Sequence, residues 1–169
     1  MYPPGWRYSE VGMKTLSRAL LLSLLLVFPL TAPADAGPVI VLRAFFTAVV
    51  NGDDKTAWSL FTRHTQDGVV KSVADSEKMD VTELRAMFDS ADQRLHDGFW
   101  ASFRSSSQAE SFVSVQMNST GPSKDAPGSV LITFPNGNTV SMLMYREGGA
   151  WKVGWFETFF PSGALPAGQ

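Results

Sequence analysis

The sequence has no cysteine, no excess of basic residues and no apolar run long enough to span a membrane. Without thiols, a zinc site of the thiolate type, a thiol nucleophile, a redox pair and a lipid-bearing cysteine are excluded. Lys and Arg number 14 against 16 Asp and Glu, a net charge of -2. This balance disfavours nucleic-acid binding, which depends mainly on neutralising phosphates.

What the sequence does contain is ordinary globular composition. Hydrophobic residues make up 44% of the 169 positions and charged residues 18%, which disfavours a disordered or collagen-like chain. Fold class and location are therefore open to prediction from the order of the residues.

The first 36 residues have the three parts of a secretory signal peptide. Lys14 and Arg18 precede an apolar run over 19–28, and small residues follow at 34–36. A basic start, an apolar centre and an Ala-x-Ala end are what the export machinery recognises. We therefore expect cleavage between Ala36 and Gly37.

A retained membrane anchor fits this segment less well. A spanning helix needs about 20 apolar residues, whereas Pro29 and Pro33 interrupt this run early. Met13 is a better translation start than Met1, because residues 1–12 lack signal character. The mature chain is then a periplasmic or secreted protein with no stable membrane anchor, and its lack of cysteine suits an oxidising compartment.

The mature chain is expected to begin with two short helices. Apolar residues recur at helical spacing from Pro38 to Asn51, and Gly52 follows as a C-terminal stop. Asp53 is a predicted N-cap for a second helix that ends near His64.

A polar stretch over 65–75 gives no periodic apolar signal. Beyond it, Asp80 is the predicted cap of one long helix that continues to about Arg104, with apolar residues every three or four positions.

The second half changes to alternating apolar residues, which predicts strands. Four strands are expected, at 112–117, 130–134, 140–146 and 151–160. A loop at 118–128 and turns at 135–138 and 148–149 connect them, and the tail at 161–169 has no periodic apolar content. Short connections make neighbouring strands antiparallel. The expected architecture is a single α+β domain over 37–160, with N-terminal helices packed on one face of a curved antiparallel sheet.

Two short patterns resemble the nuclear transport factor 2-like superfamily, also called the cystatin-like cone fold. One is Phe45-Phe46-x3-Val50-x-Gly52-Asp53-x3-Ala57-Trp58-x2-Phe61, and the other is Gly149-Ala150-Trp151-Lys152-Val153. With the order of helices before strands, the resemblance covers most of 39–160. It implies a cone whose open end holds a small molecule, in a group that includes isomerases, polyketide cyclases, dehydratases and members with no activity. Fold alone does not select among them.

The candidates for catalysis are Tyr145 and Glu157. Members that resemble ketosteroid isomerase use a carboxylate base with a tyrosine and a protonated carboxylic acid, and this trio has no match here. A turn at 148–149 places Tyr145 opposite Lys152, which puts Tyr145 and Glu157 on opposite faces of the sheet if the last strand runs through 157.

Large aromatic residues are the remaining signal for a site. They either fill the core or form the walls of an apolar pocket in a partly open cone. The candidate ligand-binding residues are Trp58, Phe61, Trp100, Phe103, Tyr145 and Trp155.

No metal or cofactor is predicted. His64 and His96 stand far apart in sequence without a ligand pattern. Met142 and Met144 share one strand face, which favours core packing over Cu(I) binding.

The leading hypothesis is an exported, non-enzymatic protein that binds a small apolar ligand or a partner protein of the cell envelope. The alternative is an enzyme of the isomerase, cyclase or dehydratase type. A homodimer formed through the open face of the sheet is also left open.

Overall fold

The computed structural model describes residues 37–121 and 126–161. The predicted signal peptide, the centre of the predicted loop at 118–128 and almost all of the predicted tail lie outside these residues. In the described part, no helix combines the length and apolar character needed to cross a membrane.

Helices α1 (Pro38–Asn51) and α2 (Asp54–Leu60) form the corner expected from the sequence. Gly52 ends α1 with a φ of 70°, in the left-handed region that glycine adopts without steric cost. The Asp53 carboxylate accepts a hydrogen bond from the backbone N–H of Thr56 at 3.0 Å, which confirms Asp53 as the cap of α2.

The predicted end of the second helix near His64 is wrong, and the polar stretch over 65–75 is helical. Helix α2 ends at Leu60 and does not reach His64, and α3 (Arg63–Glu77) occupies the polar stretch. Thr62 caps α3 by accepting from the N–H of Thr65 at 2.9 Å. The buried positions of α3 are few (Thr65, Val69, Val70 and Ala74), so its apolar stripe is too narrow to stand out in the sequence.

The single long helix predicted from Asp80 to Arg104 is divided in the structure. Asp80 does cap α4 (Val81–Ser90), but Ala91 has a φ of 53° and ends that helix. Asp92 then caps a second helical run, α5 (Gln93–Leu95), η1 (His96–Trp100) and α6 (Ala101–Ser107). The apolar period continues across this break, which is why periodicity alone predicts one helix.

The sheet has the four predicted antiparallel strands in sequential order. They are β1 (Ser114–Ser119), β2 (Gly128–Thr133), β3 (Thr139–Glu147) and β4 (Ala150–Gly154). The register places Glu147 opposite Ala150 and Tyr145 opposite Lys152, as predicted.

The fourth strand is shorter than expected, and this is a further correction. It ends at Gly154, and α7 (Trp155–Phe159) replaces its predicted second half. Tertiary contacts hold this helix: the N–H of Phe156 donates to Thr65 Oγ1 at 2.9 Å, and Thr158 Oγ1 accepts from the N–H of Leu143 at 2.9 Å. Trp155 and Glu157 therefore lie on a helix and not in a strand.

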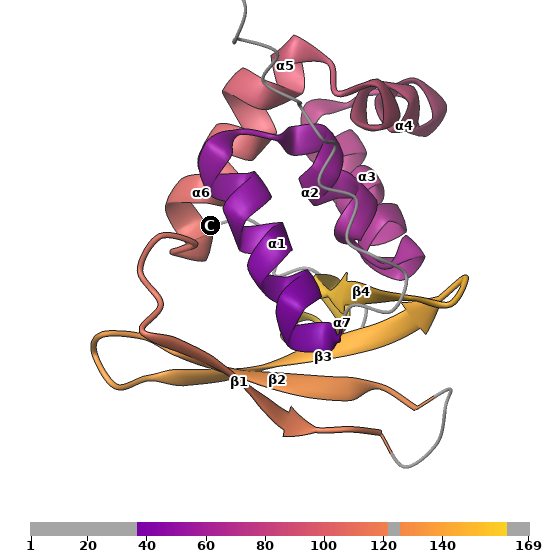
Figure 1. Cartoon of the computed structure of the whole chain (residues 1–169). Coiled ribbons are helices and arrows are strands. Elements are labelled where there is room, and N and C mark those ends of the chain that lie inside the picture. Colours follow the sequence, from indigo (N-terminus) through magenta and orange to yellow (C-terminus); the bar gives the residue numbers. More distant parts are fainter. Residues whose placement is uncertain (1–36, 122–125, 162–169) are drawn as a thin grey trace, which may run out of the picture.

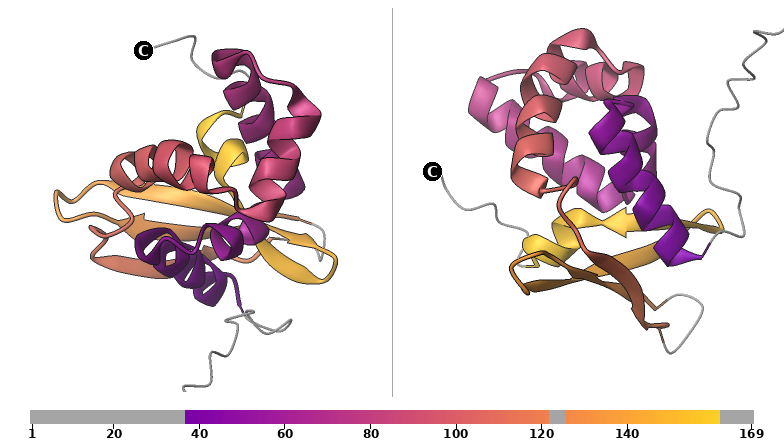
Figure 2. Two further views of the ribbon diagram at one scale, coloured as in Figure 1. Left: turned by 90° about the horizontal axis from the view of Figure 1, so that it is seen from above. Right: turned by 60° about the vertical axis from the view of Figure 1, so that its left-hand side comes forward.

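The helices gather on one side of the sheet, which does not close on itself (Figures 1 and 2). On the helix side, the strands contribute a buried apolar face of Val115, Val130, Ile132, Met142, Met144 and Val153. Polar side chains such as Gln116 and Ser141 occupy exposed positions on the other face. The predicted α+β class, with helices on one face of an antiparallel sheet, is confirmed.

Candidate functional site

Five of the six predicted ligand-binding aromatics, all except Tyr145, form one continuous cluster between the helices and the sheet. The Trp58 ring stacks on Phe88 at 4.4 Å between centroids, and the Phe61 ring lies parallel to Trp100 at 6.2 Å. Phe103 contacts Trp155 at 4.8 Å. Trp58, Phe61 and Trp100 are each at most 4% exposed, so these three aromatics serve mainly to fill the core.

Tyr145 lies on β3 and is packed against the sheet. A Cβ atom on Gly154 would come within 2.7 Å of its ring, so the ring covers the diagonal glycine on the same face. Burial raises the pKa of the Tyr145 phenol, and the negative charge of Glu157 raises it further. Tyr145 therefore stays protonated well above neutral pH.

Glu157 is held by two buried threonines at the start of α3. Its two carboxylate oxygens accept from Thr62 Oγ1 and Thr65 Oγ1, each at 2.7 Å. These bonds join α7 to α3 and give Glu157 a structural role. Neither Tyr145 nor Glu157 lines any of the three cavities that follow.

The first cavity is an apolar groove bounded by the end of α3, by α4 and by the helical run from α5 to α6. Its volume is about 610 Å³. It is lined by Val73, Ser76, Glu77, Met79, Leu84, Met87, Arg94, Leu95, Gly98, Phe99, Ser102, Phe103 and Ser106. Of the predicted ligand-binding residues, Phe103 lies here.

One wall of the apolar groove has unusual helix geometry. The segment His96–Trp100 is a π-helix, in which the wider turn changes the direction of the side chains that follow. Such turns inside α-helices often occur at functional sites. Gly98 and Phe99 in this segment both face the groove.

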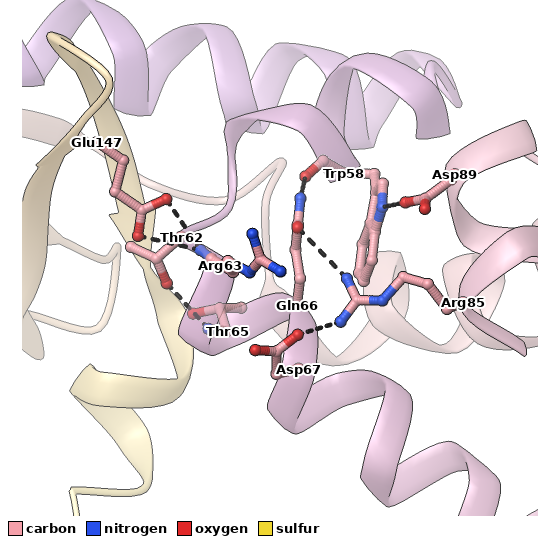
Figure 3. Close-up of polar contacts among 9 residues, drawn as sticks. All are labelled: Trp58, Thr62, Arg63, Thr65, Gln66, Asp67, Arg85, Asp89 and Glu147. Atoms are coloured by element: carbon pink, nitrogen blue, oxygen red, sulfur yellow. Dashed lines mark hydrogen bonds and ion pairs between the residues drawn. The ribbon is translucent and has the colours of Figure 1, made fainter. Parts of the chain in front are cut away.

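A second cavity, the charged cleft, lies where the α2–α3 junction meets α4 and the β3–β4 hairpin. It has a volume of about 530 Å³. It is lined by Ser59, Phe61, Arg63, Gln66, Asp67, Arg85, Asp89, Glu147 and Lys152. Figure 3 shows most of these side chains and their contacts.

Most polar groups of the charged cleft are bonded to one another. Both Glu147 oxygens accept from the backbone N–H of Arg63, at 3.0 and 3.1 Å. Asp89 accepts from the Trp58 indole N–H at 2.8 Å, and Arg85 forms an ion pair with Asp67. No sequence pattern indicates this cleft, because Arg63 and Glu147 are 84 positions apart.

A third hollow of about 560 Å³ lies between the end of α6, the β2–β3 turn and α7. Trp155 and Phe159 line it, with Phe134 and Val140 from the sheet. The six predicted ligand-binding residues are thus divided: Phe61, Phe103 and Trp155 reach three different cavities, and ligand contact by any of them stays a prediction.

The two histidines have separate surroundings. His64 packs edge-on against Phe156, whereas His96 Nδ1 lies 2.7 Å from an oxygen of buried Asp54. Arg104 also reaches Asp54, at 3.4 Å, so the three side chains tie the α1–α2 corner to the helical run. No sequence pattern indicates this contact, because the residues are distant in the chain.

Metal ligation has no support in the part of the chain that the structure describes, where no three His, Asp or Glu side chains are grouped to hold an ion. Met142 and Met144 are at most 1% exposed and belong to the core.

Comparisons of this chain with models of protein families, with curated proteins and with solved structures found no match. The resemblance to the nuclear transport factor 2-like superfamily therefore stays a prediction.

Proposed function

We propose that this protein is an exported, non-enzymatic binding protein that holds a small apolar molecule in the apolar groove. The observation that carries the proposal is the groove itself: about 610 Å³ of space beside the side chains of Leu84, Met87, Leu95 and Phe103. Ligand pockets typically enclose roughly 300–1,000 Å³ and are lined mainly by apolar side chains. A small hydrophobic ligand therefore fits both the size and the chemistry.

The walls of the groove suit a ligand of variable shape. Met79 and Met87 contribute flexible, polarizable thioethers, which adapt to irregular partners. Glu77, Arg94 and Ser102 supply polar groups among the apolar lining residues. A mostly apolar molecule with one polar end fits this lining. Its polar end would contact these polar groups, and its apolar body would contact the apolar side chains of the groove.

The enzymatic alternative has less support. Both oxygens of Glu157 are bonded to buried threonines, so the carboxylate has lost much of its freedom to act as a base. A partner-protein or homodimer role has no specific support either, because Gln116 and Ser141 place polar groups on the outer face of the sheet.

The test fills the groove with one added side chain. Ser102 lines the groove and Ser105 does not, although both are exposed on α6. We expect the dye N-phenyl-1-naphthylamine to become fluorescent with the parent protein and with Ser105→Trp, and to lose most of this signal with Ser102→Trp. Circular dichroism checks that both variants remain folded. Equal dye binding by the two variants, or no dye binding by the parent, would contradict the proposal.

A further inference from the structure

The charged cleft is separate from the apolar groove and carries an inference of its own. Its carboxylates already have donors within the protein. Glu147 receives the N–H of Arg63, Asp89 receives the indole N–H of Trp58, and Asp67 is paired with Arg85. These bonds reduce the capacity of the acidic groups to attract a cation.

The cationic side chains keep more of their donors free. The guanidinium of Arg63 makes no hydrogen bond or ion pair with any residue in 37–121 or 126–161, and Figure 3 shows it between Glu147 and Gln66. The ammonium of Lys152 donates to the carbonyl of Ser59 at 2.5 Å and has further protons to offer. The groups of the cleft that remain free to form hydrogen bonds are therefore mainly donors.

We propose that the charged cleft binds the carboxylate group of a small organic acid, with Arg63 as its main partner and Lys152 as the second. A guanidinium presents two parallel N–H groups that match the two oxygens of a carboxylate. Phe61 contributes an apolar side chain to the lining, which suits an aromatic or aliphatic body on the acid.

The charge balance of the cleft favours a carboxylate over a polyanion. Arg63, Arg85 and Lys152 face three acidic side chains, so the cleft as a whole has no excess positive charge. A phosphate dianion or a nucleic acid would gain little there, because their binding depends on a strong positive field. A monoanion can instead pair with the guanidinium of Arg63, which has no partner among residues 37–121 and 126–161.

The proposal is tested with benzoate as the probe, benzamide as its neutral counterpart and inorganic phosphate as the competing anion. Titrations of the ¹⁵N-labelled protein should show saturable shifts with benzoate at the amides of residues 59–67 and 147–152. Benzamide should bind at least about tenfold more weakly, because it lacks the negative charge that pairs with Arg63. Phosphate should also bind at least about tenfold more weakly, because the cleft has no excess positive charge to hold a dianion. Equal binding of benzoate and benzamide, stronger binding of phosphate, or no shift with benzoate would overturn the proposal.

The matched variants are Arg63→Gln and Arg146→Gln, which remove the same charge. Arg63→Gln keeps the backbone N–H that Glu147 accepts, so the junction should stay folded. Arg146 lies outside the cleft, over the ring of Trp151 at 4.8 Å. We expect Arg63→Gln to weaken benzoate binding about tenfold or more and Arg146→Gln to leave it unchanged. Unchanged binding by Arg63→Gln would refute the site, whatever the outcome for the apolar groove.

Discussion

Among single residues, Gly68 is a point of close contact between α3 and α7. A Cβ atom at this position would lie 2.8 Å from the ring of buried Phe156. Phe156 is also fixed by its backbone bond to Thr65, so the ring has little freedom to move away. The close approach of the two helices depends on the absence of a side chain here.

We expect Gly68→Ala to lower the free energy of unfolding by about 1–3 kcal/mol, the usual cost of overpacking a core. The control is Gly98→Ala, because a Cβ on Gly98 meets nothing within 4 Å. Thermal melts followed by circular dichroism measure both variants. A Gly68→Ala protein as stable as the parent would show that the α3–α7 contact is loose.

Asp92 is the residue whose charge state the structure perturbs most clearly. Hydrogen bonds from the side chain and backbone of Arg94 lower the pKa of Asp92 from 3.8 to about 2. Because the folded-state pKa lies below the unfolded value, the interaction stabilises the fold above about pH 3.8 and is lost as the pH falls toward 2.

An NMR titration of the Asp92 carboxyl carbon should give a midpoint near 2. Asp92→Asn removes the charge but keeps an N-cap side chain. At neutral pH we therefore expect Asp92→Asn to have a higher free energy of unfolding than Asp92→Ala. An ordinary midpoint near 3.8 would mean that Arg94 does not hold this carboxylate in solution.

At the scale of elements, α7 exists because α3 supplies partners for it. Thr65 Oγ1 accepts from the N–H of Phe156 and donates to Glu157, and Thr65 itself is fully buried. The helix has only five residues, too few to be stable alone in water.

Thr65→Val should therefore destabilise α7 selectively. The valine has nearly the same shape but leaves the Phe156 N–H and one Glu157 oxygen without their partner, a loss of about 1–3 kcal/mol. Hydrogen exchange at residues 155–159 should become faster than exchange in the sheet. Thr65→Ser restores the hydroxyl and should recover protection. Similar exchange in the valine and serine variants would remove Thr65 from this role.

In the molecule as a whole, the core combines a connected cluster of aromatics with aliphatic side chains, and the cavities lie around it. Phe45 and Phe61 are at most 1% exposed and contact each other at 4.9 Å in the middle of the cluster. Both proposed sites border this cluster: the apolar groove lies between α3, α4 and α6, and the charged cleft lies beside the α2–α3 junction. A ligand at either site would leave the core intact, so binding and folding can be altered separately.

Export is a prediction about the whole chain. Protein purified from its own cell envelope or medium should begin at or near Gly37, because the basic start, apolar run and Ala34-Asp35-Ala36 match the pattern of a cleavable signal. N-terminal sequencing or intact-mass measurement tests this. A soluble cytoplasmic protein that still carries Met1 or Met13 would contradict it.

Features that depend on near neighbours in the chain can be predicted from the sequence alone. Gly52 and Asp53 are sufficient to predict the α1–α2 corner, and Asp80 to predict the start of α4, because stops and caps act within one helical turn. The turn at Gly148-Gly149 likewise fixed the register of β3 and β4, since a short connection leaves one antiparallel pairing.

Features that depend on distant partners in the chain emerge only in the folded molecule. Helix α3 buries only a narrow apolar stripe, which the sequence pattern does not reveal. Residues Trp155–Phe159 form α7 because the N–H of Phe156 donates to Thr65, which is 91 positions away in the chain. The charged cleft and the apolar groove arise in the same way, from side chains that meet only after the helices have packed. Local propensity is too weak to specify such contacts, because their energies are gained only when the whole fold brings the partners together.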